Sequence, residues 1–317
     1  ARHPAIMGNI TPAPLRTEAN SLRAGVTEAQ NPNSARIDEL STLAIVQTIN
    51  EEDVKVQPAV TAVLPQLAQA VDAITARMRK GGRLIYLGAG TSGRLGVLDA
   101  SEVLPTFGVS PEIVTGRIAG GYGALLYAVE GAEDSAELGA EEIRTLAVTP
   151  TDSIVGIAAS GSTPYVLGAL AEARRRSALT IGLACNPRAK LIEYSDIAIL
   201  PVPGPEIISG STRMKAGTAQ KMTLNILSTA VMIRLGKVYG NLMVDVLPSN
   251  SKLIARQRRI TAQACGISEE AAAALLARCS GETKTAIVCH LAGVTPDEAR
   301  KRLKAADGFI RRAVQTG

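Results

Sequence analysis

The chain has 317 residues, a net charge of +5 and 46% hydrophobic residues, so it can form one large domain with an appendage or two domains. Aromatic residues make up only 3% and Trp is absent, which leaves few platforms for stacking bases and speaks against nucleic acid as a partner. No apolar run approaches the length of a membrane span and no secretory core begins the chain, so we expect a cytoplasmic protein without a membrane partner.

The first third of the chain reads as an extension followed by helices. Residues 1–25 are rich in proline with little periodicity, and we predict a flexible N-terminal extension. Apolar residues at helical spacing predict a helix over 34–50, whose apolar stripe must be buried somewhere. A second helix is predicted over 58–80, ended by a pair of glycines.

Strand and helix patterns then alternate, which indicates an α/β fold with a parallel sheet covered by helices on both faces. We predict strands over 83–87, 112–116, 153–158, 178–184 and 196–201. We predict helices from Gly93 onward and over 121–129, 135–146, 164–176 and 212–235. In such a sheet ligands bind at the carboxyl ends of the strands.

Two loops rich in glycine and hydroxyl groups follow two of these strands, at 88–93 and 159–164. Glycines there let backbone N–H groups at a helix N-terminus approach an anion. The first loop fits the dinucleotide fingerprint, which also requires an acidic residue at the end of the next strand. Glu112 instead stands at the beginning of the next strand segment. Each loop alone also fits a tight turn with a capping hydroxyl, whereas the pair favours one compact phosphate. The residues expected to bind it are Gly90, Thr91, Ser92, Ser160, Ser162 and Thr163.

Carboxylates come first as acid and base candidates, because the only histidines, His3 and His290, lie outside the alternating region. Pro105 disfavours helix at the residue before it, so we expect the helix to end and the chain to turn near Glu102. That turn would bring Glu102 back toward the first loop, and Glu133 follows a helix-breaking glycine. From spacing alone both acids also fit ordinary solvated or dipole-stabilising positions at helix ends.

A cationic helix start follows the last strand, with Ser211 as the expected N-cap. Its cations are Arg213, Lys215 and Lys221. Positive charge at a helix N-terminus opposes the helix dipole and needs an anion, which a substrate phosphate, Glu206 or a carboxylate of a neighbouring subunit could supply. We expect Glu206 and Ser211 to contact the substrate.

After about residue 250 only helical patterns remain, at 250–265, 269–279, 283–292, 296–305 and 307–315. We therefore divide the chain into the extension over 1–25, a catalytic domain over 26–262 and a small all-helical domain over 263–317. The four cysteines form no C-x-x-C pair, which indicates free thiols in a reducing compartment. Cys289 and His290 would point about 100° apart on a helix, so we expect no zinc or other metal site.

The two loops resemble those of sugar isomerase (SIS) domains, which bind phosphosugars. Longer strings are similar to the N-acetylmuramic acid 6-phosphate etherase family, at 84–96, 99–102, 128–134, 210–221 and 240–245. The resemblance runs from about Thr27 to the end and implies a SIS-type three-layer αβα sandwich with a parallel sheet, plus a small C-terminal all-helical domain. One departure is Ser162, where the family commonly has Arg.

The resemblance implies a lyase that cleaves the ether between C3 of the sugar and D-lactate, leaving N-acetylglucosamine 6-phosphate in peptidoglycan recycling. It implies ring opening, removal of the C2 proton, loss of lactate and addition of water, with no metal, nucleotide or other cofactor. Glu102 resembles the family's proton donor and Glu133 its second active-site carboxylate. Two acids suit a reaction that needs both a base at C2 and a proton for the leaving oxygen.

Two alternatives remain at this point: a non-catalytic phosphosugar sensor like the glucokinase regulatory protein, and an aldose–ketose isomerase. The presence of both Glu102 and Glu133 in a chain with one such domain favours the etherase. We also expect a homodimer with active sites near the interface, because the stripe over 34–50 and the cationic helix start both need a partner.

Overall fold

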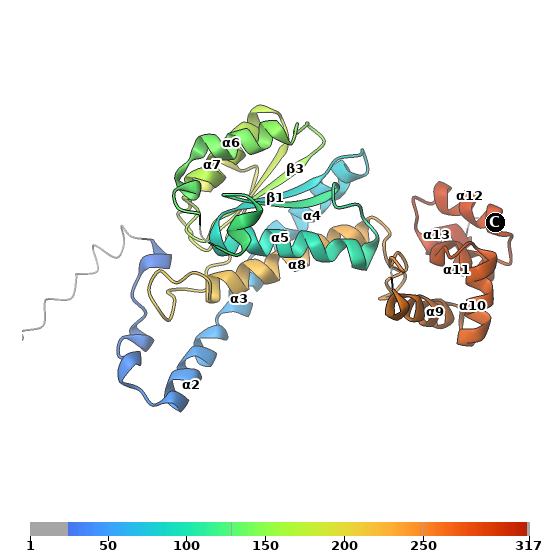
Figure 1. The fold of residues 1–317 in the computed structure, drawn as a ribbon, viewed down its shortest axis with the longest axis horizontal. Coiled ribbons are helices and arrows are strands. Elements are labelled where there is room, and N and C mark those ends of the chain that lie inside the picture. Colours follow the sequence, from blue (N-terminus) through green and yellow to red (C-terminus); the bar gives the residue numbers. More distant parts are fainter. Residues whose placement is uncertain (1–24, 128, 249, 316–317) are drawn as a thin grey trace, which may run out of the picture.

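The computed structural model describes residues 25–127, 129–248 and 250–315. The extension expected over 1–25 therefore lies outside the described residues, apart from Gly25. Figure 1 shows an α/β domain, an arm of N-terminal helices on one side of it and a separate group of helices at the carboxyl end.

The centre of the α/β domain is a five-stranded parallel sheet with the order β2-β1-β3-β4-β5. Its strands are β1 (Leu84–Gly88), β2 (Val114–Ile118), β3 (Ser153–Ile157), β4 (Leu179–Leu183) and β5 (Ile197–Ile199), close to the predicted ranges. Gly88 at the end of β1 lies level with Ile118 on one side and Ile157 on the other. The chain winds outward in both directions from β1 and β3, and such a switch point opens a crevice at the carboxyl ends of the strands.

Helices cover both faces of the sheet, which confirms the three-layer sandwich. On β1, Leu84 and Tyr86 enter one core while Ile85 and Leu87 enter the other, as the alternation of a strand requires. The first face carries α4 (Leu64–Met78), α5 (Gly90–Phe107) and α8 (Lys215–Arg234). The second carries α6 (Ala136–Thr145), α7 (Pro164–Arg175) and the short turn η6 (Lys190–Tyr194).

The N-terminal helices differ from the prediction in two places. Helix begins only at α2 (Thr42–Asp53), capped by Ser41, after the short 3-10 turns η1 (Val26–Glu28), η2 (Pro32–Ser34) and η3 (Ile37–Glu39). The helix expected over 58–80 is two helices, α3 (Val56–Thr61) and α4. Pro65 causes the break, because it has no N–H for the carbonyl of Thr61 and its ring excludes that carbonyl.

No single helix among the described residues is long and apolar enough to cross a membrane. One pair of segments, 42–61 and 64–78, reaches that length and composition only in combination, and the two are bent by 55° relative to each other.

Helix α5 corrects the expectation that the chain turns near Glu102. The helix runs on to Phe107 with Pro105 inside it. The N–H missing at Pro105 leaves the carbonyl of Ser101 without its helical partner, and both residues are exposed, so water can take its place. The helix ends at Gly108, whose φ of 62° is the left-handed conformation of a glycine C-cap.

Two further predicted helices are shorter than expected. The described residues of the segment over 121–129, which leave out residue 128, hold only the 3-10 turn η4 (Tyr122–Leu125); it follows Gly120 and Gly121, both at positive φ. Helix α8 begins at Lys215 instead of residue 212, and its first N–H groups, those of Lys215 and Ala216, donate to the carboxylate of Glu206 and not to Ser211. The expected N-cap role of Ser211 is therefore wrong.

The carboxyl-terminal helices form a unit with its own core. They are α9 (Ser251–Cys265), α10 (Glu269–Arg278), α11 (Thr283–Ala292), α12 (Pro296–Ala305) and α13 (Ile310–Gln315). Val244, Val246 and Ile260 belong to this core, so the packed unit reaches N-terminal to residue 263, where we had divided the chain. Asp245 joins it to the sheet domain through Lys237 (3.2 Å) and Lys284 (2.7 Å).

Candidate active site

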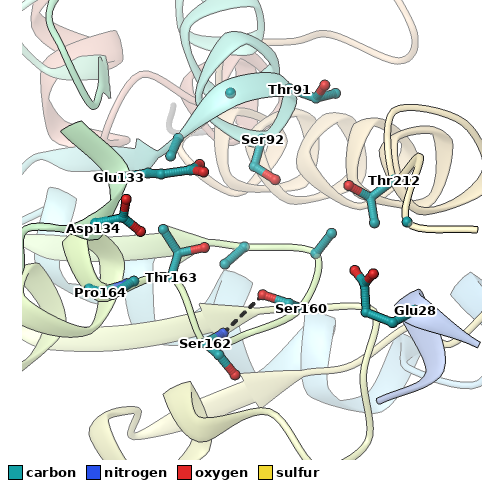
Figure 2. A pocket seen from close by; sticks show the side chains of 15 residues that line it. Glu28, Thr91, Ser92, Glu133, Asp134, Ser160, Ser162, Thr163, Pro164 and Thr212 are labelled. Atoms are coloured by element: carbon teal, nitrogen blue, oxygen red, sulfur yellow. Dashed lines mark hydrogen bonds between the residues drawn. The ribbon is translucent and has the colours of Figure 1, made fainter. Parts of the chain in front are cut away.

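A cavity of about 320 Å³ opens at the switch point, between the carboxyl ends of β1 and β3 (Figure 2). Its walls come from the loops that follow these strands, from η5 (Ala132–Asp134), from η1 and from the loop before α8. The polar side chains that line it are Glu28, Thr91, Ser92, Glu133, Asp134, Ser160, Ser162, Thr163 and Thr212.

Two helix N-termini point their free N–H groups at this cavity. Helix α5 starts after Ala89 and helix α7 after Thr163, and neither has a side-chain cap. At α5 the first N–H groups have no side-chain acceptor. At α7, Pro164 has no N–H and the N–H of Val166 donates to the carbonyl of Thr163, so the N–H of Tyr165 is the one left for an anion. The first loop requires glycine, because a Cβ at Gly93 would lie 2.7 Å from the carbonyl oxygen of Gly88.

The loop hydroxyls surround the same space. All six loop residues predicted to bind a phosphate line the cavity: Gly90, Thr91, Ser92, Ser160, Ser162 and Thr163. Ser92 donates from Oγ to Oε1 of the buried Gln220 on α8 (2.9 Å). The N–H of Ser162 donates to Oγ of Ser160 (3.2 Å), the bond drawn in Figure 2.

The structure separates the two predicted carboxylates. Glu133 lies in η5 after Gly131, whose positive φ of 73° turns the chain, and it lines the cavity. Glu102 is exposed on α5, about 18 Å along the helix from Gly90, and does not line the cavity.

A buried network fixes the rotation of α5 and hence where Glu102 lies. Asp99 accepts hydrogen bonds from Tyr86 (2.9 Å), Asn225 (2.7 Å) and Ser228 (3.1 Å). Burial raises the pKa of Asp99 above its ordinary value, and these hydrogen bonds offset the rise only in part. The network ties α5 to both β1 and α8.

The anion expected at the cationic start of α8 comes from the same chain. Glu206 is 1% exposed and accepts from the backbone N–H groups of Lys215 (3.0 Å) and Ala216 (2.9 Å). Lys215 is fully buried and its ammonium pairs with Glu52. Neither Glu206 nor Ser211 lines the cavity, so the structure does not bring these two expected substrate contacts to it.

Sequence reasoning missed three polar residues that line the cavity: Glu28, Asp134 and Thr212. Thr212 follows Ser211 and Asp134 follows Glu133, both of which we had predicted as site residues. This position in the loop was the only feature of the sequence that could have indicated them. Glu28 lies in η1, which the loop before α8 holds by a bond from the N–H of Gly210 to the carbonyl of Thr27 (3.2 Å). No local pattern in the sequence predicts that contact across some 180 residues.

No group of three or more His, Cys, Asp or Glu side chains among the described residues could hold a metal ion. The cysteines are free thiols: Cys185, Cys265, Cys279 and Cys289. Burial raises the pKa of the Cys185 thiol to about 12, and the charge of Glu206 adds to the rise.

The chain matches curated relatives, a family model and solved structures. The chain is 55% identical over 289 residues to N-acetylmuramic acid 6-phosphate etherase of Aeromonas hydrophila, covering 91% of this chain and 97% of that one. It is 54% identical over 297 residues to the protein of the same name from Rhodopirellula baltica, covering 94% and 98%. A family model, the glucokinase regulatory protein N-terminal SIS domain, matches residues 66–174.

Among solved structures, a phosphoheptose isomerase from Francisella tularensis is similar with a TM-score of 0.47 and 17% identity. The match covers 61% of this chain and 100% of that one.

Proposed function

The chain belongs to the N-acetylmuramic acid 6-phosphate etherase family, and on that basis we propose how its pocket carries out the reaction. It is an enzyme that cleaves the D-lactyl ether of N-acetylmuramic acid 6-phosphate, which yields N-acetylglucosamine 6-phosphate and D-lactate during peptidoglycan recycling. The alignments cover 97% and 98% of these two relatives.

We propose that the 6-phosphate binds where the N-termini of α5 and α7 meet. The observation that carries this proposal is the convergence of two uncapped helix N-termini on one cavity at the switch point of the sheet. Hydroxyls of Ser160 and Thr163 would add hydrogen bonds to the phosphate oxygens, and that of Ser92 would do so after turning away from Gln220.

With the phosphate there, Glu133 is the carboxylate that we propose acts on the sugar. Ring opening exposes the C1 aldehyde, which makes the proton on C2 acidic, and Glu133 accepts that proton. The electron pair forms the C2=C3 double bond as the bond from C3 to the lactyl oxygen breaks, and a carboxylic acid gives the leaving oxygen its proton. Water then adds its hydroxyl to C3 and re-protonates the donor, while Glu133 returns its proton to C2.

We propose that the proton donor is Glu102 of a second subunit. On its own chain Glu102 is exposed and about 18 Å along α5 from the phosphate loop, farther than one hexose extends. The apolar residues of α2 are also exposed, with Leu43 at 65% and Val46 at 52%, which supports an assembly of two chains. A homodimer that covers α2 and brings α5 to the partner's pocket would give Glu102 access to the substrate.

Replacing Glu133 with Gln tests the chemistry. We expect kcat for D-lactate release to fall by at least about 100-fold, because the base at C2 is lost, while the affinity for N-acetylglucosamine 6-phosphate stays within about threefold. Glu137→Gln is the control, since Glu137 is exposed on α6 and lies outside the cavity. A Glu133→Gln enzyme with full turnover would refute the assignment.

The phosphosugar sensor remains a second candidate, because the matching family model describes the SIS domain of a regulatory protein. Release of D-lactate by the purified chain distinguishes the etherase from both the sensor and an aldose–ketose isomerase. We further propose that the enzyme works in the cytoplasm without nucleic acid or membrane partners, in keeping with its free thiols.

A further inference from the structure

The cavity described above is only half of a larger hollow. A second cavity of about 290 Å³ adjoins it and shares three of its lining residues, Ala89, Gly90 and Glu133. The second cavity extends from Glu133 between the first turns of α5 and the η4 loop. Glu133 therefore lies between two spaces, each large enough for part of a substituted sugar.

The two cavities differ in charge. Among the described residues, no Lys or Arg lines the first cavity, and Glu28, Glu133 and Asp134 do line it. The second cavity is lined by Arg94, beside Glu130 and Glu133. Arg94 is thus the basic side chain available to a ligand that fills both spaces.

The side chain of Arg94 is held in a fixed position. Its Nε donates to the carbonyl of Leu125 (2.9 Å) and its Nη2 to the carbonyl of Ala124 (2.7 Å). A guanidinium carries five N–H donors in a rigid plane, so three remain after these two bonds. Because the group is already ordered, little side-chain entropy is lost when it binds a carboxylate.

The substrate of the proposed function carries an anion at each end: the 6-phosphate and the carboxylate of the lactyl group on C3. With the phosphate at the helix N-termini of the first cavity, Glu28 and Asp134 repel a second anion from that space. We propose that the lactyl carboxylate enters the second cavity and binds Arg94. C2 and C3 then lie beside Glu133, between the two anionic ends.

This inference rests on the proposed function, and it makes Arg94 the residue that distinguishes the lactyl sugar phosphate from sugar phosphates without the lactyl group. It also gives the second cavity a purpose that a simple phosphosugar isomerase would not need. A guanidinium binds a carboxylate at C3 more strongly than it binds a hydroxyl or another neutral group there.

The test uses two ligands that differ only in the lactyl group. They are the 1,5-anhydro form of N-acetylmuramic acid 6-phosphate and the 1,5-anhydro form of N-acetylglucosamine 6-phosphate. Neither has an anomeric hydroxyl, so neither can open its ring or be turned over, and calorimetric titration measures their binding at equilibrium. We expect Arg94→Gln to weaken the lactyl ligand by about 10- to 100-fold and the other ligand by less than about twofold, with partial recovery in Arg94→Lys.

Arg117→Gln is the matched control. Arg117 contacts the same η4 turn, through Nη1 and the hydroxyl of Tyr122 (3.4 Å), but lines neither cavity. We expect both affinities to survive this change. Equal weakening of both ligands in Arg94→Gln, no weakening of either, or the same loss in Arg117→Gln would overturn the proposal.

The outcomes separate this inference from the proposed function. If wild-type enzyme releases no D-lactate from the natural sugar phosphate, the reaction assignment fails, while selective weakening of the lactyl ligand by Arg94→Gln still supports the carboxylate site. If wild-type enzyme releases D-lactate and Arg94→Gln weakens both ligands equally, the reaction assignment stands and the role of Arg94 is refuted.

Discussion

Every uncharged polar side chain that lines the first cavity carries a hydroxyl group. Thr91, Ser92, Ser160, Ser162, Thr163 and Thr212 all line it. A phosphate dianion in a space that also holds carboxylates must be stabilised by oriented N–H and O–H dipoles instead of cations. This arrangement explains why hydroxyl residues recur after two separate strands.

The triple variant Ser92→Ala, Ser160→Ala and Thr163→Ala should therefore lose substrate affinity. A hydrogen bond to a charged group contributes about 1.5–3 kcal/mol, so we expect a large rise in KM with a smaller change in kcat. Steady-state assays of D-lactate release measure both constants. Thr106→Ala, at the end of α5 remote from the cavity, should leave KM unchanged, and an unchanged KM in the triple variant would place the phosphate elsewhere.

The site was predictable where one loop holds all the information and not where distant segments meet. Glycines and hydroxyls directly after a strand were enough to predict the residues with which both loops line the cavity, since local geometry alone places them at helix N-termini. Glu206 has the same kind of local signal, but its carboxylate accepts from the first backbone N–H groups of α8 and does not line the cavity. Glu28 could not be found, because contacts between η1 and the loop before α8 place it in the cavity.

Helix α8 and the N-terminal segment are joined by a buried ionic network centred on Glu52. Its carboxylate accepts from Asn31 (2.8 Å) and Asn33 (2.7 Å) and pairs with Lys215 and Lys55. Burial acts to raise the pKa of Glu52, but the hydrogen bonds from these partners outweigh it and hold the pKa at about 2. The network keeps η1, with Glu28, beside the cavity.

Replacing Glu52 with Gln should destabilise the fold, because it leaves the fully buried Lys215 ammonium without its counter-ion. We expect a loss of about 3–5 kcal/mol in the free energy of unfolding at neutral pH, measured by urea titration. Glu52→Gln with Lys215→Met should lose less than Glu52→Gln alone, since no unpaired charge remains. Equal losses in the single and double variants would show that the ion pair is not what stabilises this junction.

Because the pKa of Glu52 is lowered in the folded chain, its contribution to the free energy of unfolding is lost at low pH. Glu52 ionises at about pH 2 in the folded chain and near its ordinary value of 4.5 when unfolded. The unfolded chain thus binds more protons between these values, so the contribution of Glu52 is complete above about pH 4.5 and is lost as the pH falls through about 2. The difference in the free energy of unfolding between wild type and Glu52→Gln should therefore become smaller as the pH falls from about 4.5 to about 2.

The strands were predictable to within one or two residues, because buried apolar runs bounded by turn residues have few alternatives. The ends of the helices were harder to predict from the sequence. Pro105 stays inside α5 because its missing bond faces water, and Pro65 breaks a helix that periodicity alone would continue. Such outcomes depend on which face of a helix is buried, and that is decided by tertiary packing.

The arm formed by α2 leaves apolar surface uncovered on the single chain. Figure 1 shows α2 extending away from the sheet domain, and Leu40, Leu43 and Val46 are each at least 39% exposed. A groove between α4 and α8, lined by apolar residues such as Leu67, Val71 and Ile226, also lies open. We expect α2 of one subunit to pack against the partner, because soluble chains seldom leave such surfaces exposed. Lys215 no longer supports this expectation, since its ammonium pairs with Glu52 and the first N–H groups of α8 donate to Glu206 within the same chain.

A mixing experiment decides whether the two subunits share each active site. If Glu133 of one chain and Glu102 of its partner complete one pocket, then Glu102→Gln and Glu133→Gln homodimers are each inactive. Mixed dimers of the two variants regain one intact pocket, and random re-association of equal amounts should restore roughly a quarter of wild-type D-lactate release. Variants that stay inactive after exchange, although mass spectrometry shows mixed dimers, would mean that both acids must come from one chain. A chain that remains a monomer at full turnover would contradict the shared site altogether, because exposed Glu102 could then reach no pocket but its own.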